Sequence, residues 1–112
     1  MTKRYLVTGG CGFIGSHLVE ALLRTGAQVR VLDNLSSGRI ENLAAVRDRV
    51  EVVVGDVRDL EAVARAAAGV DGIFHEAALV SVFDSVERPR DNHEINATGT
   101  LNVLLAARAQ GV

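Results

Sequence analysis

A glycine-rich turn near the amino terminus is the part of this sequence best suited to chemistry. An apolar stretch leads into it, and the glycines repeat as GxxGxxG and GxGxxG in the run Val7-Thr8-Gly9-Gly10-Cys11-Gly12-Phe13-Ile14-Gly15. Glycine lets the backbone bend sharply and lets a pyrophosphate approach where a Cβ would be in the way. A helix that begins behind the turn offers free N–H groups and the positive end of its dipole. The run therefore predicts a phosphate-binding turn.

Asp33 is the second residue that could bind a ligand. It follows the predicted strand Val29–Leu32 and lies 18 residues after Gly15. A carboxylate at this place can accept hydrogen bonds from both hydroxyls of an adenosine ribose, and it would repel a 2′-phosphate. A carboxylate after a strand is also a common turn or helix cap. Because strand, glycines and helix precede it in the right order, we favour ribose binding and hence NAD over NADP.

Strand and helix signals alternate along the chain, and these elements must position the two candidate groups. We expect strands at Arg4–Thr8, Gln28–Leu32, Val50–Val54 and a buried Val70–His75, helices at 12–25, 40–49, 60–68 and 91–110, and a loop over 76–90. This alternation predicts an α/β fold, a Rossmann-type doubly wound parallel sheet with the strand order 3-2-1-4. NAD would lie across the carboxyl ends of strands one and four, where the strand order reverses.

Size and composition narrow the class of protein. The 112 residues are 48% hydrophobic, which suits one domain with one core, and the formal net charge is -2. No basic patch interleaved with aromatic residues is visible, so we expect no nucleic-acid partner. No apolar run has the length of a signal-peptide core or a membrane span, and a single cysteine fits a reducing compartment. We therefore expect a cytoplasmic protein with no membrane partner.

Together these motifs resemble the extended short-chain dehydrogenase/reductase family. The resemblance is to its nucleotide-sugar epimerases and dehydratases, and most closely to the NAD-dependent 4-epimerases of UDP-sugars. It extends over Lys3–Val112 through TGGCGFIGSHL (8–18), LDNLSSG (32–38), GDVRD (55–59), FHEAA (74–78), the serine and proline spacing of 81–89 and NATGTLNVL (96–104). Several motifs in the right order make a chance similarity improbable.

The resemblance implies a set of cofactor-binding positions. The pyrophosphate would be held by Gly9, Gly12, Phe13, Ile14 and Gly15, the adenosine ribose by Asp33 and Asn34, the rest of the adenosine side by Ser37 and Gly38, the adenine edge by Asp56 and Val57, and the nicotinamide ribose by Ala77 and Ala78. The sugar pocket would be edged by Ser81 and Val82, for which a plain loop is the equal alternative. Glu76 replaces a residue that is often apolar in the family, and we expect it to point away from the cofactor. Val80 lies where some of the epimerases carry a lysine.

The implied reaction is the inversion of a sugar carbon by transient oxidation to a ketone, with hydride transfer to and from bound NAD. A dehydratase or decarboxylase shares every motif, and a non-catalytic NAD-binding sensor or scaffold is the alternative from another class. The family's reaction uses a Tyr-x-x-x-Lys pair, whereas the single tyrosine and single lysine here are Tyr5 and Lys3. We therefore expect residues 1–112 to be the amino-terminal part of an NAD-binding domain, inactive alone, from a parent enzyme that is a homodimer.

Other reactive side chains have simpler explanations. Cys11 lies near a helix N-terminus, where a thiol pKa can fall, but no second cysteine is present and we expect inert packing. His17, His75 and His93 lack metal-ligand spacing, so we expect no metal site. Asn96 could bond inward to the loop after the fourth strand, or it could cap a helix or face solvent.

Overall fold

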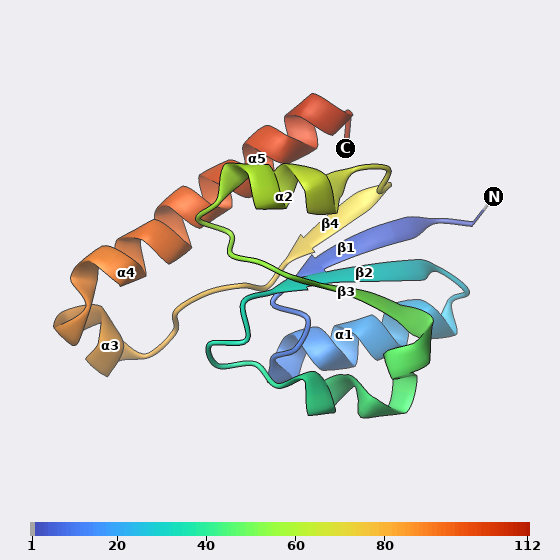
Figure 1. The fold of residues 1–112 in the computed structure, drawn as a ribbon, viewed down its shortest axis with the longest axis horizontal. Helices are drawn as coiled ribbons and strands as arrows, with labels where there is room; N and C mark the ends of the chain where they lie inside the picture. Colours follow the sequence, from blue (N-terminus) through green and yellow to red (C-terminus); the bar gives the residue numbers. More distant parts are fainter. Residues whose placement is uncertain (1) are drawn as a thin grey trace.

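The computed structural model describes residues 2–112 and has an open parallel sheet with helices on both faces (Figure 1). The strands are β1 (Arg4–Thr8), β2 (Gln28–Asp33), β3 (Val50–Val54) and β4 (Gly72–His75). They lie in the order β3-β2-β1-β4, and each neighbouring pair is parallel. The predicted fold class and strand order are confirmed. In this register Thr8 lies opposite both Leu32 and His75, so the carboxyl ends of three strands meet at one edge.

Helices cover the two faces of the sheet (Figure 1). On one face lie α1 (Phe13–Arg24) and the 3₁₀ segment η1 (Ile40–Arg49), and on the other lie α2 (Leu60–Ala67) and α5 (Gly99–Gln110). The short helices α3 (Val82–Glu87) and α4 (Pro89–His93) and the π-helical turn η2 (Glu94–Thr98) lead into α5. None of the helices in residues 2–112 is both long and apolar enough to cross a lipid bilayer.

Alternating side chains of the central strands build the core on both faces. Leu6 and Leu32 are fully buried in a cluster with residues of α2 and α5, whereas Val7 and Val31 are fully buried in a cluster with residues of α1 and η1. Successive residues of a strand point to opposite faces, so a strand covered on both sides is a continuous apolar run. Residues 5–7 of β1 form such a run, whereas Arg30 interrupts the apolar residues of β2.

Four expected elements differ from the structure in their bounds, burial or helix type. The fourth strand covers only Gly72–His75 and is not buried, because β4 is an edge strand in the described residues and leaves Phe74 37% exposed. The segment 40–49 is a 3₁₀ helix, whose three-residue repeat places both Leu43 and Val46 in the core. The expected loop over 76–90 contains α3, and the last helical run begins at Pro89, a residue favoured in the first helical turn.

Candidate functional site

The glycine turn joins β1 to α1, and three of its glycines are required by the protein itself. A Cβ on Gly10 would lie 2.6 Å from a methyl group of Val31, which is fully buried. Gly9 has a φ of +69°, and a Cβ there would lie 2.7 Å from the backbone N of Ala77. A Cβ on Gly15 would collide with the carbonyl oxygen of Gly9. Gly9 therefore makes the turn, and Gly15 lets α1 pack closely against it.

Gly12 is different, because its backbone does not need glycine and a Cβ there would make a single close contact. Its φ of -78° and ψ of 178° suit any residue, and a Cβ would meet only the carbonyl oxygen of Gly9, at 3.3 Å. Gly12 is also the N-cap of α1, which has no side-chain cap and no acidic residue in its first turn. The first N–H groups of a helix have no partner within the helix. Open space in front of these donors fits an anionic ligand, as a pyrophosphate-binding turn requires.

Asp33 ends β2 beside this turn and is 8% exposed. One carboxylate oxygen, Oδ2, accepts a hydrogen bond from the N–H of Cys11 at 3.0 Å, and Oδ1 accepts one from the N–H of Leu35 at 2.8 Å. Gly38 packs against Cys11 and Asp33, since a Cβ there would lie 2.9 Å from the carbonyl carbon of Cys11 and 3.0 Å from Oδ2 of Asp33. Each carboxylate oxygen can accept two hydrogen bonds, so capacity remains for ribose hydroxyls. The ligand role of Asp33 stays a prediction from the sequence, which gave no sign that this carboxylate ties two loops together.

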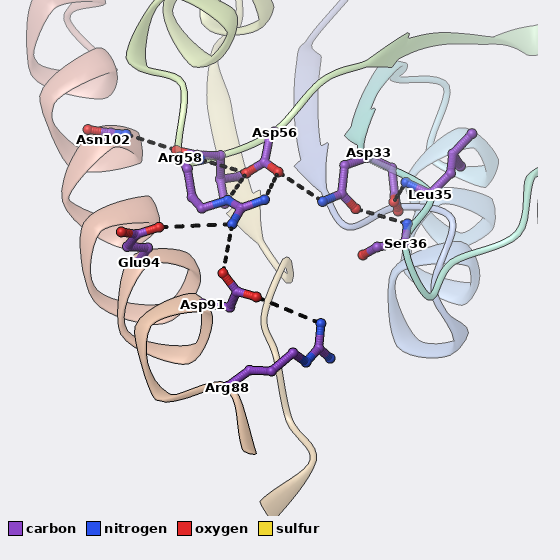
Figure 2. Close-up of polar contacts among 11 residues, drawn as sticks. Asp33, Leu35, Ser36, Asp56, Arg58, Arg88, Asp91, Glu94 and Asn102 are labelled. Atoms are coloured by element: carbon purple, nitrogen blue, oxygen red, sulfur yellow. Dashed lines mark hydrogen bonds and ion pairs between the residues drawn. The ribbon is translucent and has the colours of Figure 1, made fainter. Parts of the chain in front are cut away.

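Asp56 follows β3 and is held by Arg58, to which the sequence analysis assigned no role (Figure 2). Its Oδ1 accepts from the backbone N–H and the Nε of Arg58, at 2.9 and 3.0 Å. Its Oδ2 accepts from Nη2 of Arg58 at 2.7 Å and from Nδ2 of Asn34 at 3.0 Å. Chiefly because of the Arg58 side chain, the pKa of Asp56 lies far below its ordinary value. Arg58 also pairs with Asp91 and Glu94, and so links this loop to α4 and η2.

The four hydrogen bonds fill the acceptor capacity of the Asp56 carboxylate. An adenine amino group can therefore bond to it only if one donor leaves. Three of the donors belong to Arg58, so the amide of exposed Asn34 is the least costly to displace. Its release would free Asn34 for the ribose, the role that the resemblance implies for it.

Other predicted positions fall into two groups, those in the segments that follow the strands and those that begin α3. Val57 is 5% exposed and its carbonyl accepts from Asn102, so its N–H is the group left for a ligand. Ala77 and Ala78 follow β4, with Ala77 against Gly9, while exposed Ser37 lies in the loop after β2. By contrast, Ser81 and Val82 begin α3, which extends away from the sheet edge (Figure 1). The Ser81 hydroxyl accepts from the N–H of Asp84 as a helix cap.

The structure also places the residues that were expected to have no role in binding. Burial, with the nearby charge of Asp33, raises the pKa of Cys11 to about 11, so the thiol is not activated by the helix N-terminus. Asn96 bonds inward: its Oδ1 accepts from the N–H of Leu79 at 2.8 Å, and its Nδ2 donates to the carbonyl of Leu79 at 2.9 Å. Within residues 2–112 no three histidine, cysteine or acidic side chains gather as metal ligands. Tyr5 packs edge-on against Phe74, with ring centroids 5.6 Å apart.

Comparison with known proteins identifies the family. Residues 5–112 match the model of the NAD dependent epimerase/dehydratase family. The chain belongs to this family. It is 47% identical to the UDP-glucose 4-epimerase of Thermus thermophilus, crystallised in complex with NAD, with a TM-score of 0.87 over 97% of this chain and 35% of that one. It is 42% identical to the dTDP-glucose 4,6-dehydratase of Streptomyces venezuelae, also bound to NAD, with a TM-score of 0.90 over 97% and 37% of the two chains.

The chain is also similar to a dehydrogenase whose name indicates a steroid substrate. Human 3 beta-hydroxysteroid dehydrogenase type 7 is 41% identical over 110 residues, which are 96% of this chain and 30% of that protein. The chain thus spans about a third of the length of the relatives it matches. Because relatives with such different substrates share this third, it carries the features common to an NAD-dependent family. NAD is confirmed as the cofactor at the level of the family.

Proposed function

We propose that residues 1–112 are the NAD-binding part of a nucleotide-sugar epimerase. The observation that carries the proposal is Gly12 at the uncapped start of α1, where the backbone angles suit any residue and a Cβ would make one close contact, 3.3 Å from the carbonyl oxygen of Gly9. A Cβ at this position would fill the place that a pyrophosphate needs. The residues present therefore fit the cofactor on which the family depends.

Each cofactor-binding residue has one task in this proposal. The first N–H groups of α1, with Gly9 and Gly12, hold the pyrophosphate, while Asp33 accepts from the ribose hydroxyls. Asp56 and the N–H of Val57 meet the adenine edge. Ala77 and Ala78 leave room for the nicotinamide ribose because their side chains are small. When bound, NAD would supply the hydride acceptor and donor for the transient oxidation of a sugar carbon to a ketone.

A UDP-sugar is the substrate that we propose for the whole protein, on the similarity to UDP-glucose 4-epimerases. A dTDP-sugar dehydratase is the second candidate, because the Streptomyces venezuelae dehydratase is nearly as similar. The homodimer and the cytoplasmic location stay predictions from the sequence.

The test uses the natural full-length protein and two substrates. Incubation with UDP-glucose, followed by NMR of the sugar, is expected to show UDP-galactose. Conversion of dTDP-glucose to a 4-keto-6-deoxy sugar, without epimerisation of UDP-glucose, would favour the dehydratase. NAD binding with no turnover of either sugar would contradict both enzymes and favour the sensor or scaffold.

A further inference from the structure

A chain of side-chain hydrogen bonds crosses from β1 through β4 to α5, beside the predicted nicotinamide end of the site. The hydroxyl of Thr8 lies 2.7 Å from Nδ1 of His75, and Nε2 of His75 lies 3.1 Å from the hydroxyl of Thr100. The Thr100 hydroxyl is 2.7 Å from the carbonyl oxygen of Asn96. All three side chains are at least partly buried.

The donor and acceptor of each hydrogen bond in this series follow from the groups at its two ends. At one end, the Thr8 hydroxyl oxygen accepts from the backbone N–H groups of Glu76 and Ala77, at 3.1 and 3.2 Å, and the Glu76 N–H is shared with the backbone carbonyl of Thr8 at 3.1 Å. With both lone pairs used, its own proton goes to Nδ1 of His75, which must therefore be unprotonated. At the other end, a carbonyl can only accept, so Thr100 donates to Asn96 and receives the Nε2 proton of His75.

His75 is therefore held as the neutral tautomer that carries its proton on Nε2. A second proton, on Nδ1, would face the proton of Thr8 and force that hydroxyl to turn away from its two N–H donors. Burial lowers the pKa of His75, against a smaller opposite effect of the Glu76 carboxylate. The groups that face the ring from β1 and α5, Thr8 and Thr100, are uncharged.

We propose that His75 is a positioning residue for the cofactor site. As the Nε2–H tautomer it orients the Thr8 hydroxyl, which holds the N–H groups of Glu76 and Ala77 and so keeps Ala77 against the turn at Gly9. The contact is tight, since a Cβ on Gly9 would lie 2.7 Å from the Ala77 nitrogen. A small shift of Ala77 therefore changes the backbone surface that the nicotinamide ribose is expected to contact. This inference rests on the proposed NAD site.

The tautomer can be measured without any ligand. In the natural full-length protein labelled with ¹⁵N-histidine, long-range ¹H–¹⁵N spectra at pH 7 are expected to show His75 with its proton on Nε2. His17 is an internal comparison, because its Nδ1 lies 2.7 Å from the carbonyl oxygen of Phe13 and must donate to it. A His75 that is doubly protonated, or protonated on Nδ1, would overturn the inference.

Substitutions test the link to NAD. His75→Leu removes the acceptor for the Thr8 proton, and we expect the Kd for NAD to rise about tenfold, the size of one lost hydrogen bond. His75→Asn keeps an acceptor near the position of Nδ1 and is expected to stay within about threefold of the wild type. The matched controls are His93→Leu and His93→Asn, at an exposed histidine outside this chain of bonds. Wild-type affinity in folded His75→Leu would refute the positioning role.

The pH dependence of NAD binding supplies a readout that loss of packing would not change. Because the pKa of His75 is lowered, the wild-type affinity is expected to hold as pH falls through the ordinary histidine value of 6.5 and to weaken only at lower pH. His75→Asn should lack this decline. A wild-type protein that binds no NAD would reject the proposed function, while the spectra would still decide the tautomer.

Discussion

Gly12→Val separates the cofactor role of the glycine turn from its structural role. The glycine has extended backbone angles that valine adopts readily, and its Cβ would meet only the carbonyl oxygen of Gly9 at 3.3 Å. The added methyl groups would project into the open space in front of α1. We therefore expect the variant to fold, at a cost of about 1–2 kcal/mol in the free energy of unfolding, because valine is a poor N-cap and the carbonyl oxygen of Gly9 must move slightly.

The same methyl groups would occupy the space that the pyrophosphate needs to reach the first N–H groups of α1. Hydrogen bonds to a charged group contribute about 1.5–3 kcal/mol each. Loss of two such bonds costs about 3–6 kcal/mol, which corresponds to a rise in the Kd for NAD of roughly a hundredfold to ten-thousandfold. Gly12→Ala, with one carbon, should give a smaller loss in the same direction.

The assay is calorimetric titration of the natural full-length protein with NAD, beside thermal unfolding of each variant. Gly15→Ala is the matched control, because its Cβ would collide with the carbonyl oxygen of Gly9 and should lower the Tm. Gly12→Val should lower the Tm less than Gly15→Ala does and should lose NAD binding. A folded Gly12→Val protein with wild-type affinity would show that the pyrophosphate lies elsewhere.

Three further predictions concern the neighbouring residues and the sheet edge. Asp33→Ala is expected to lose most of the preference for NAD over NADP, and to lower the Tm because the carboxylate accepts from two backbone N–H groups; equal wild-type Kd values for the two cofactors would contradict the assignment. Cys11→Ala should keep NAD affinity within about tenfold, and the buried thiol should resist alkylation at pH 7 until the protein unfolds. Isolated residues 1–112 should show no epimerase turnover and should self-associate through the edge of β4 in size-exclusion chromatography; turnover in a preparation free of full-length enzyme would contradict this.

The sequence by itself determined the order of elements and the place of the cofactor turn. The glycines between Val7 and Gly15, and the apolar runs that become β1 and β2, are local signals, because backbone conformation and side-chain alternation repeat over a few residues. The position of Asp33 after a strand was visible for the same reason. The exposure of β4 was not visible in its own residues, since an apolar strand has the same composition at an edge as at the centre of a sheet; it follows from the strand order, which places β4 at an edge of the described sheet.

Only the tertiary structure determined which polar groups form hydrogen bonds with one another. Asp33 meets Cys11 across 22 positions of the sequence, and Thr8 meets His75 across 67. The register of the parallel strands brings these groups to one edge of the sheet. No local sequence pattern predicts hydrogen bonds between residues so far apart in the chain. The difference between Gly12 and Gly15 has the same origin. Both are glycines in one motif, but only three-dimensional packing leaves open space beside one and places a carbonyl oxygen beside the other.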